Sequence, residues 1–258
     1  MNITGIPALV GTYDNYIWIL QQDNLAWVVD PGQSEQVIDY LEKNSLTLQA
    51  ILITHRHFDH VEGIPDLKAA YPDAVVYGPQ KTDNAHIQKR LQEGDQLELT
   101  ADFTLTVMDT PGHTEDHICF YNPQALFCAD TLFTAGCGRL LGGTVEQFSQ
   151  SLLRLNSLPD DTPVYTAHEY TADNLKFALI VEPGNTALQA RIQKLEIDYP
   201  DLHQGAQSLL KEEKATNPFL RFETDQIKKQ LLKRGANDTP ASLFKVLRQW
   251  KDQFDRQN

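Results

Sequence analysis

The chain has 258 residues, enough for one large domain or for a principal domain with a smaller appendage. Asp and Glu number 35 against 22 Lys and Arg, which gives a formal net charge of -13. Such a surface repels phosphate backbones and anionic lipid, so we expect neither nucleic acid nor membrane as a partner.

The N-terminal region predicts an early β-hairpin. Met1–Val10 has no basic residue ahead of its apolar stretch and does not resemble a secretory signal, so we expect a cytoplasmic protein. Ile17–Leu20 and Ala26–Val29 are strand-like runs separated by the polar turn Gln21–Asn24. Asp30-Pro31-Gly32 then ends the second strand.

Strands and helices alternate through the next part of the chain. Apolar residues at helical spacing predict a helix over Ser34–Lys43, and Thr144 is the predicted N-cap of a helix over Thr144–Leu155. Ala50–Thr54 is a short apolar run, as expected of a strand buried on both faces. The other predicted strands are Val75–Tyr77, Phe103–Met108, His117–Tyr121, Ala125–Cys128 and Val164–Thr166.

The pattern changes near Thr171. Strand-like runs cease, and apolar residues such as Leu243, Leu247 and Trp250 recur at helical spacing. We therefore expect a catalytic domain over residues 1–170 and an all-helical domain over residues 171–258.

Metal-binding residue types are concentrated directly after the apolar strand. His55, His57, Asp59 and His60 lie within six residues. Alternate residues of an extended chain share one side, so His55 and His57 can face one centre, whereas Asp59 and His60 can reach a second. The alternative, a polar loop with chance histidines, explains such a dense set poorly.

Further donors lie at the ends of later strands. His113 follows a Pro-Gly turn, Asp130 ends the strand that begins at Ala125, and His168 follows the last predicted strand. Proteins of the α/β class gather their sites at such strand ends. Five histidines and two aspartates suffice for two metal ions that share one bridging ligand.

Some other polar residues compete with these donors or could support them. His117 is the competitor of His113, but it opens an apolar strand, so we expect a satisfied, partly buried side chain that can support a ligand from behind. His86 and His203 are expected at the surface. Asp109 is a candidate for orienting a ligand. The cysteines form no CxxC pair and are expected as buried or semi-buried free thiols in a reducing compartment, and Cys137 is not expected to act as a nucleophile.

The donor order H-x-H-x-D-H, followed by single His, Asp and His residues, resembles the metallo-β-lactamase superfamily. This resemblance implies an αββα sandwich. Further stretches, running almost to the C-terminus, look like the glyoxalase II (hydroxyacylglutathione hydrolase) family, which carries a C-terminal all-helical domain. These stretches are Ala135–Arg139, His168–Thr171, Asn174–Ala178, Val181–Asn185, Asn217–Arg221 and Lys251–Phe254.

The resemblance implies two divalent metal ions in each chain, bridged by a hydroxide. The implied ligands are His55, His57 and His113 for one ion, Asp59, His60 and His168 for the other, and Asp130 between them. Zinc is expected first, and iron or manganese are alternatives because His and Asp donors accept all three metals.

The resemblance also implies residues that bind glutathione, namely Arg139, Tyr170, Arg248 and Lys251. Each has a simpler interpretation: a loop arginine, a core tyrosine, or the solvated face of an amphipathic helix. Glutathione carries two carboxylates, however, and an acidic protein needs a local basic site to bind it. Leu141 stands where many members carry an aromatic residue, which predicts a weaker contact there.

The implied reaction is hydrolysis of S-2-hydroxyacylglutathione, such as S-D-lactoylglutathione, to glutathione and a 2-hydroxy acid, the second step of methylglyoxal detoxification. The lack of a G-x-S-x-G motif agrees with attack by hydroxide. The alternatives are another hydrolase of the same fold, a mononuclear-iron persulfide dioxygenase, or a non-catalytic metal-binding scaffold. We expect a monomer that acts on a small-molecule glutathione thioester.

Overall fold

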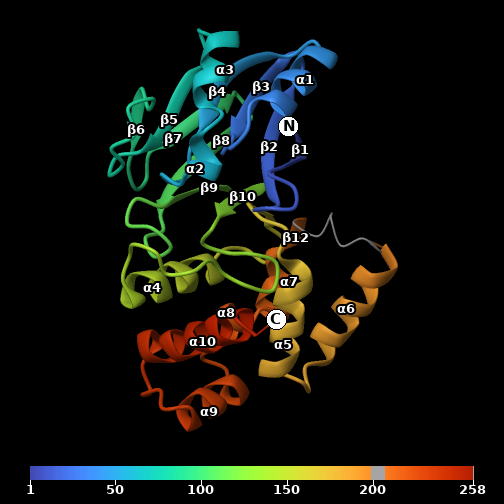
Figure 1. Ribbon diagram of the computed structural model, residues 1–258, viewed down its shortest axis with the longest axis vertical. Coiled ribbons are helices and arrows are strands. Elements are labelled where there is room, and N and C mark those ends of the chain that lie inside the picture. Colours follow the sequence, from blue (N-terminus) through green and yellow to red (C-terminus); the bar gives the residue numbers. More distant parts are fainter. Residues whose placement is uncertain (199–206, 258) are drawn as a thin grey trace.

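The computed structural model describes residues 1–198 and 207–257. Two six-stranded sheets pack face to face, and helices cover their outer faces (Figure 1). The strand order is β1-β2-β3-β4-β5-β6 in the first sheet and β12-β11-β10-β9-β8-β7 in the second. The expected αββα arrangement is therefore confirmed.

The first sheet contains the predicted hairpin, in which Leu20 of β2 lies opposite Trp27 of β3. From β3 to β6 the strands run parallel, so the carboxyl ends of β3, β4 and β5 lie at one edge of the sheet. Strands β1 and β6 were not predicted. The strands are β1 (Asn2–Ala8), β2 (Asn15–Gln22), β3 (Leu25–Val29), β4 (Thr47–Leu52), β5 (Val75–Pro79) and β6 (Lys89–Leu91).

Two helices cover the outer face of the first sheet. They are α1 (Glu35–Lys43) and α3 (Ile64–Ala70). Val37 and Leu41 of α1 and Leu67 of α3 pack in one apolar cluster with strand residues such as Ile19 and Ile51. Their burial follows from the helical spacing of these apolar side chains.

The second sheet includes a strand that corrects the sequence analysis. β12 pairs antiparallel with β11, and Ser208 lies opposite Val164, although strands were expected to cease after Thr171. A three-residue strand is too short to show alternation, and its partner is distant in sequence. The strands are β7 (Gln96–Thr100), β8 (Phe103–Asp109), β9 (Ile118–Asn122), β10 (Ala125–Ala129), β11 (Pro163–Thr166) and β12 (Gln207–Leu209).

Helix α4 (Val145–Asn156) begins as predicted at Thr144. The Thr144 hydroxyl accepts a hydrogen bond from the Gln147 amide at 3.1 Å, and the Gln147 side chain accepts one from the Thr144 amide at 2.8 Å. This reciprocal pair satisfies two amides that the first turn of a helix leaves free.

The C-terminal helices lie over the outer face of the second sheet, below the sandwich in Figure 1. Phe148 of α4 and Phe244 of α10 pack 5.1 Å apart in one cluster with Leu126 and Cys128 of β10. The expected helical region is thus present and shares a core with the second sheet. Its helices are α5 (Thr171–Val181), α6 (Thr186–Asp198), α7 (Leu210–Thr216), α8 (Pro218–Arg221), α9 (Asp225–Lys233) and α10 (Pro240–Asp255). Within the described ranges, none of the helices has both the length and the apolar composition needed to cross a membrane.

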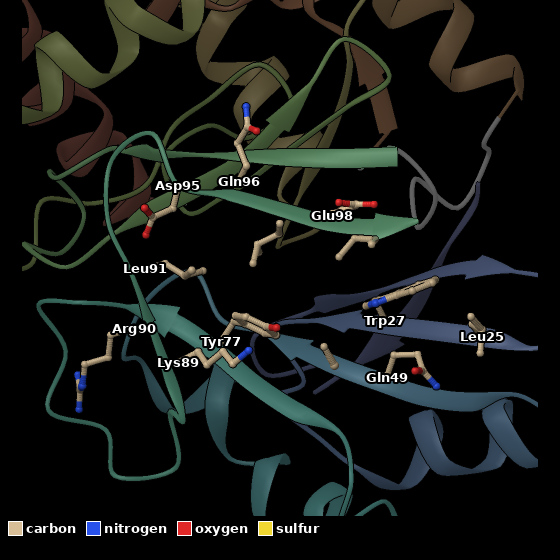
Figure 2. A pocket seen from close by; sticks show the side chains of 13 residues that line it. Leu25, Trp27, Gln49, Tyr77, Lys89, Arg90, Leu91, Asp95, Gln96 and Glu98 are labelled. Carbon is tan, nitrogen blue, oxygen red and sulfur yellow. The ribbon is translucent and has the colours of Figure 1, made fainter. Parts of the chain in front are cut away.

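The space between the sheets is filled mainly by apolar side chains, among them Trp18, Phe120 and Phe127. At the edge where β6 faces β7, the sheets leave a cavity of about 700 Å³. Figure 2 shows Trp27 and Tyr77 extending into this space from the strands of the first sheet. Among the described residues, none lines both this cavity and the site at the carboxyl ends of the strands.

Candidate metal centre

Strand ends of both sheets bring the seven predicted metal donors together. His55 and His57 follow β4, and Asp59 and His60 lie in the short helix α2 (Phe58–Val61) that comes next. The second sheet supplies the others: His113 follows β8, Asp130 follows β10 and His168 follows β11. His57 is half-buried and the other six are buried.

One group of donors consists of three histidines and an aspartate. The donor atoms of His55, His57, His113 and Asp130 all lie within 4.8 Å of one another. The Nδ1 atom of His57 lies 3.1 Å from Nε2 of His55 and 2.9 Å from Nε2 of His113. Four ligands arranged tetrahedrally at zinc–nitrogen distances are about 3.4 Å apart. The spacing therefore fits one cation.

The second group is formed by Asp59, His60 and His168, whose donor atoms also lie within 4.8 Å of one another. The Oδ2 atom of Asp59 lies 3.4 Å from Nε2 of His60 and 3.5 Å from Nε2 of His168. Asn15 holds the aspartate in place, because its amide group donates to Oδ2 of Asp59 at 3.2 Å.

Asp130 lies between the two groups. Its Oδ2 atom is 3.2 Å from Nε2 of His113, which belongs to the first group. Its Oδ1 atom is 3.4 Å from Nε2 of His60 and 3.2 Å from Nε2 of His168, which belong to the second. One carboxylate thus presents a different oxygen to each group, which is the arrangement of a bridging ligand.

Unpartnered polar atoms also indicate a cation site. Within the described part of the chain, Nε2 of His60 and Oδ1 of Asp130 are buried and have no hydrogen-bond partner. Such orphaned atoms are costly, and a metal ion would satisfy both.

A third possible group of donors joins Asp30 to His55 and His60. Asp30 already accepts two hydrogen bonds from Thr54, so it fits a supporting role better.

The outer nitrogens of three donors lie close to oxygen atoms, and two of them are hydrogen-bonded. Nδ1 of His113 lies 2.7 Å from the carbonyl oxygen of Arg139, and Nδ1 of His168 lies 2.7 Å from that of Tyr13. Nδ1 of His60 lies 3.0 Å from Oδ2 of Asp30. In His113 and His168, an Nδ1–H that donates to the carbonyl oxygen leaves the Nε2 lone pair free for a metal ion. The contact of His60 with Asp30 is a close charged contact without hydrogen-bond geometry.

Asp30 is a functional residue that sequence analysis missed. It was interpreted only as part of the turn Asp30-Pro31-Gly32, and the signal that could have identified it is its place at the end of a buried strand. Its φ of 52° is in the left-handed region, which its hydrogen bonds to the Thr54 amide (2.8 Å) and hydroxyl (2.6 Å) compensate. Asp109 was expected to orient a metal ligand. That expectation was wrong, because the Asp109 carboxylate pairs with Lys81 at 3.1 Å.

His117 lies behind the donors and does not line their cavity. Its ring stacks on that of His55 at 4.9 Å, and its Nδ1 atom lies 2.9 Å from the hydroxyl of Thr110. The side chain is wholly buried and its Nε2 atom has no hydrogen-bond partner, whereas a satisfied, partly buried histidine was expected. His86 is exposed as predicted, and His203 lies outside the described residues.

The pKa values of the donor histidines shift in two directions. Burial would lower the pKa values of His60 and His168, but nearby carboxylates, among them Asp130, raise both. Burial lowers the pKa of His55 well below its ordinary value, and burial likewise lowers the pKa values of His57 and His113. Burial alone would raise the pKa of Asp59, but the close approach of His60 holds that pKa at about 2. Neutral imidazoles and ionised carboxylates are the forms that bind metal ions.

Close backbone approach explains two glycines beside the donors. A Cβ atom on Gly32 would lie 1.9 Å from the carbonyl oxygen of Asp59, and one on Gly138 would lie 2.1 Å from that of Asp130. No other residue type fits without moving a segment that carries a donor.

A cavity of about 620 Å³ opens beside the two donor groups. It is lined by five of the donors: His57, Asp59, His113, Asp130 and His168. All four residues predicted to bind glutathione line the same cavity, namely Arg139, Tyr170, Arg248 and Lys251. Residues far apart in sequence are therefore gathered around one space, next to the candidate metal ligands.

The residues on one side of this cavity come from the loops after β10 and β11. The ring of Tyr170 stacks on that of His168 at 4.9 Å with an interplanar angle of 3°. Burial raises the pKa of the Tyr170 phenol, so its hydroxyl stays protonated and can donate a hydrogen bond. Arg139 and Leu141 are exposed at the mouth of the cavity.

Helix α10 also lines the cavity, and its residues Arg248 and Lys251 are each only 5 % exposed. The alternative interpretation, that Arg248 and Lys251 form the solvated face of an amphipathic helix, is therefore wrong. Nη1 of Arg248 donates to the carbonyl oxygen of Cys137 at 3.0 Å, and Lys251 pairs with Asp255.

The three cysteines are buried and free, as predicted. Cys137 lines the cavity, but burial raises its pKa to about 11. The protonated thiol is a weak nucleophile.

Comparison with known protein families accounts for almost the whole chain. Residues 10–168 match the metallo-beta-lactamase superfamily, and residues 169–254 match the hydroxyacylglutathione hydrolase C-terminus. A hydroxyacylglutathione hydrolase of Hydrogenovibrio crunogenus is 42% identical, over 100% of this chain and 97% of that protein.

Solved structures with the same fold are more distant in sequence. ETHE1 from Myxococcus xanthus is 21% identical, with a TM-score of 0.66 over 98% of this chain and 100% of that one. TTHA1623, solved in a di-iron-bound form, is 26% identical, with a TM-score of 0.59 over 83% of this chain and 100% of that one.

Proposed function

The chain belongs to the hydroxyacylglutathione hydrolase family of the metallo-β-lactamase superfamily, and we propose that it hydrolyses S-2-hydroxyacylglutathione at a centre of two divalent metal ions. The observation that supports two ions most directly is the position of Asp130, whose two oxygens face different donor groups. The di-iron form of TTHA1623, which shares the fold, agrees with this proposal.

In this proposal the donors divide as the sequence predicts. His55, His57 and His113 would hold one ion, and Asp59, His60 and His168 would hold the other. Asp130, which faces both groups, would serve both ions. Ions at these positions would supply a solvent molecule that ionises near neutral pH and a positive charge facing the thioester carbonyl oxygen. Zinc is the first metal we propose, since histidine-rich tetrahedral groups suit it, and iron or manganese are alternatives.

The chain's own residues would bind and orient the glutathione part. Arg139 and the α10 pair Arg248 and Lys251 provide positive charge for its carboxylates. The protonated hydroxyl of Tyr170 provides a hydrogen-bond donor beside His168. The exposed side chain of Leu141 can offer only an apolar contact at the mouth of the cavity. The acyl group would then lie near the donor groups.

The leaving group needs little help from the protein. A thiol is far more acidic than an alcohol or an amine, so the glutathione sulfur can leave as a thiolate. Neither a covalent nucleophile nor a general acid is required, which agrees with the protonated, buried thiol of Cys137. We propose D-lactoyl as the acyl group. A cytoplasmic location and a monomeric state stay predictions.

The proposal is tested by measuring turnover of S-D-lactoylglutathione and the metal content of the same sample. We expect hydrolysis, about two metal ions in each chain, and loss of both with a strong chelator. A metal-replete protein that leaves the thioester intact would refute the proposal. The persulfide dioxygenase alternative predicts oxygen consumption and a single iron, and the likeness to ETHE1 shows the shared fold alone.

A further inference from the structure

The basic pair of the substrate cavity is already occupied by an acid of this chain. Asp255, the last residue of α10, lines the cavity and contacts both basic residues. Its Oδ2 atom lies 3.5 Å from Nη2 of Arg248, and its Oδ1 atom pairs with Nζ of Lys251. The one carboxylate bridges the two cations in the way that a carboxylate of a ligand would.

This arrangement removes most of the positive charge that an anionic ligand would meet. Asp252 pairs with Arg248 at 3.0 Å, so two aspartates balance the two cations. Asp173 also lines the cavity, but its carboxylate pairs with Lys176 at 2.9 Å. A ligand carboxylate that approaches the α10 pair therefore encounters a site that is close to neutral, unless an internal aspartate moves away.

Asp255 has a position from which its carboxylate can turn away from the two cations. It occupies the C-terminal end of its helix, where the helix dipole disfavours a negative charge. Its contacts with Arg248 and Lys251 hold it there, and a competing carboxylate would weaken them. Its side chain is 19% exposed, so solvent can receive it when it swings away.

We propose that Asp255 is an internal competitor for the carboxylate subsite formed by Arg248 and Lys251, and so sets the affinity for glutathione thioesters. This inference rests on the proposed function. A carboxylate of glutathione replaces that of Asp255 on the two cations, and Asp255 turns to solvent. Binding exchanges one ion pair for another, which keeps affinity lower than the burial of two cations would otherwise give.

The test compares D255N with D252N, a matched change in the same turn of α10. Asp252 also pairs with Arg248 but does not line the cavity. Calorimetry gives the Kd of S-hexylglutathione, a thioether that cannot be hydrolysed, and kinetics give KM and kcat for S-D-lactoylglutathione. For D255N we expect Kd and KM to fall about three- to tenfold with kcat unchanged, and D252N should change Kd much less.

A second ligand separates competition from other roles. The diethyl ester of S-hexylglutathione lacks both carboxylates, so its Kd should be the same for wild-type protein and D255N. A higher or unchanged Kd for S-hexylglutathione in D255N would overturn the inference, since Asp255 would then support the cations or contact the ammonium group of glutathione. D255S, with a shorter side chain, should behave like D255N, and thermal unfolding checks that both variants fold.

The two proposals fail in different ways. If wild-type protein hydrolyses S-D-lactoylglutathione and D255N does not bind S-hexylglutathione more tightly, the inference alone is overturned. If wild-type protein with its full metal content hydrolyses no acyl-glutathione, the proposed function falls and the inference falls with it.

Discussion

Arg248 donates a hydrogen bond to the carbonyl oxygen of Cys137 at 3.0 Å, and this contact joins the last helix of the chain to the loop after β10. Two residues further along, the carbonyl oxygen of Arg139 lies 2.7 Å from Nδ1 of His113. The helix that would bind glutathione is thus linked, through one short loop, to a candidate metal ligand.

Replacing Arg248 should chiefly weaken substrate binding. R248A removes a buried cation from the cavity and the hydrogen bond to the Cys137 carbonyl. Loss of a charged hydrogen bond predicts a KM for S-D-lactoylglutathione that is higher by about tenfold or more. Steady-state kinetics measure this, and R248K, which keeps the charge but loses the planar fork, should lie between R248A and wild type. An unchanged KM in R248A would count against the proposed subsite.

Removing a donor should abolish hydrolysis and metal binding together. D130A deletes the carboxylate between the two groups, and H57A deletes one imidazole of the first. We expect less than about one thousandth of the wild-type turnover and a reduced metal content, measured by elemental analysis of the purified variants. H86A is the matched control, because His86 is exposed and lies outside the cavity. Near-normal hydrolysis by D130A would contradict the proposed centre.

Asp30 should matter for metal affinity although it lies behind the donors. Its carboxylate is 3.0 Å from Nδ1 of His60 and accepts two hydrogen bonds from Thr54. D30N keeps the shape but removes the charge that orients the imidazole, so metal affinity should fall about 10- to 100-fold. Competition with a chromogenic chelator measures this directly. Unaltered affinity would show that the Asp30–His60 contact does not tune the site.

The structure brings together the seven residues that the sequence predicted as donors, and their meeting was predictable because the pattern is local. His55 to His60 follow one strongly apolar strand, and His113, Asp130 and His168 each follow a predicted strand. Since strands of an α/β protein end at a common edge, their meeting follows from the element order. Other local signals predicted the hairpin β2–β3, from two apolar runs around a polar turn, and the Thr144 cap, from its residue type.

What the sequence did not reveal depends on long-range packing. Strand β12 exists because Ser208 reaches Val164, and no local signal marks a strand of three residues. The burial of Arg248 and Lys251 depends on how α10 packs over the loop at Cys137. On an isolated helix, charges at that spacing indicate a solvated face, so only the tertiary contacts could correct that interpretation.

An ion pair away from the metal centre gives the stability a defined pH dependence. Glu182 follows α5, and both of its oxygens accept hydrogen bonds from Arg221, at 2.7 and 2.8 Å. Burial alone would raise the pKa of Glu182, but these bonds hold it below its ordinary value. A carboxyl group with a depressed folded-state pKa stabilises the fold above its unfolded pKa of about 4.3, and this stabilisation is lost as the pH falls through the folded-state value.

E182Q should therefore be less stable than the wild type at pH 7, by about 2 kcal/mol, because Arg221 loses its charged partner in a mostly buried site. The difference should shrink as the pH falls below about 4, since protonation of Glu182 removes the same interaction from the wild type. Urea unfolding of both proteins at several pH values measures it, with D161N as a control for an exposed pair. A difference that stays constant from pH 7 to pH 3 would show that the Glu182 carboxylate is not the stabilising group.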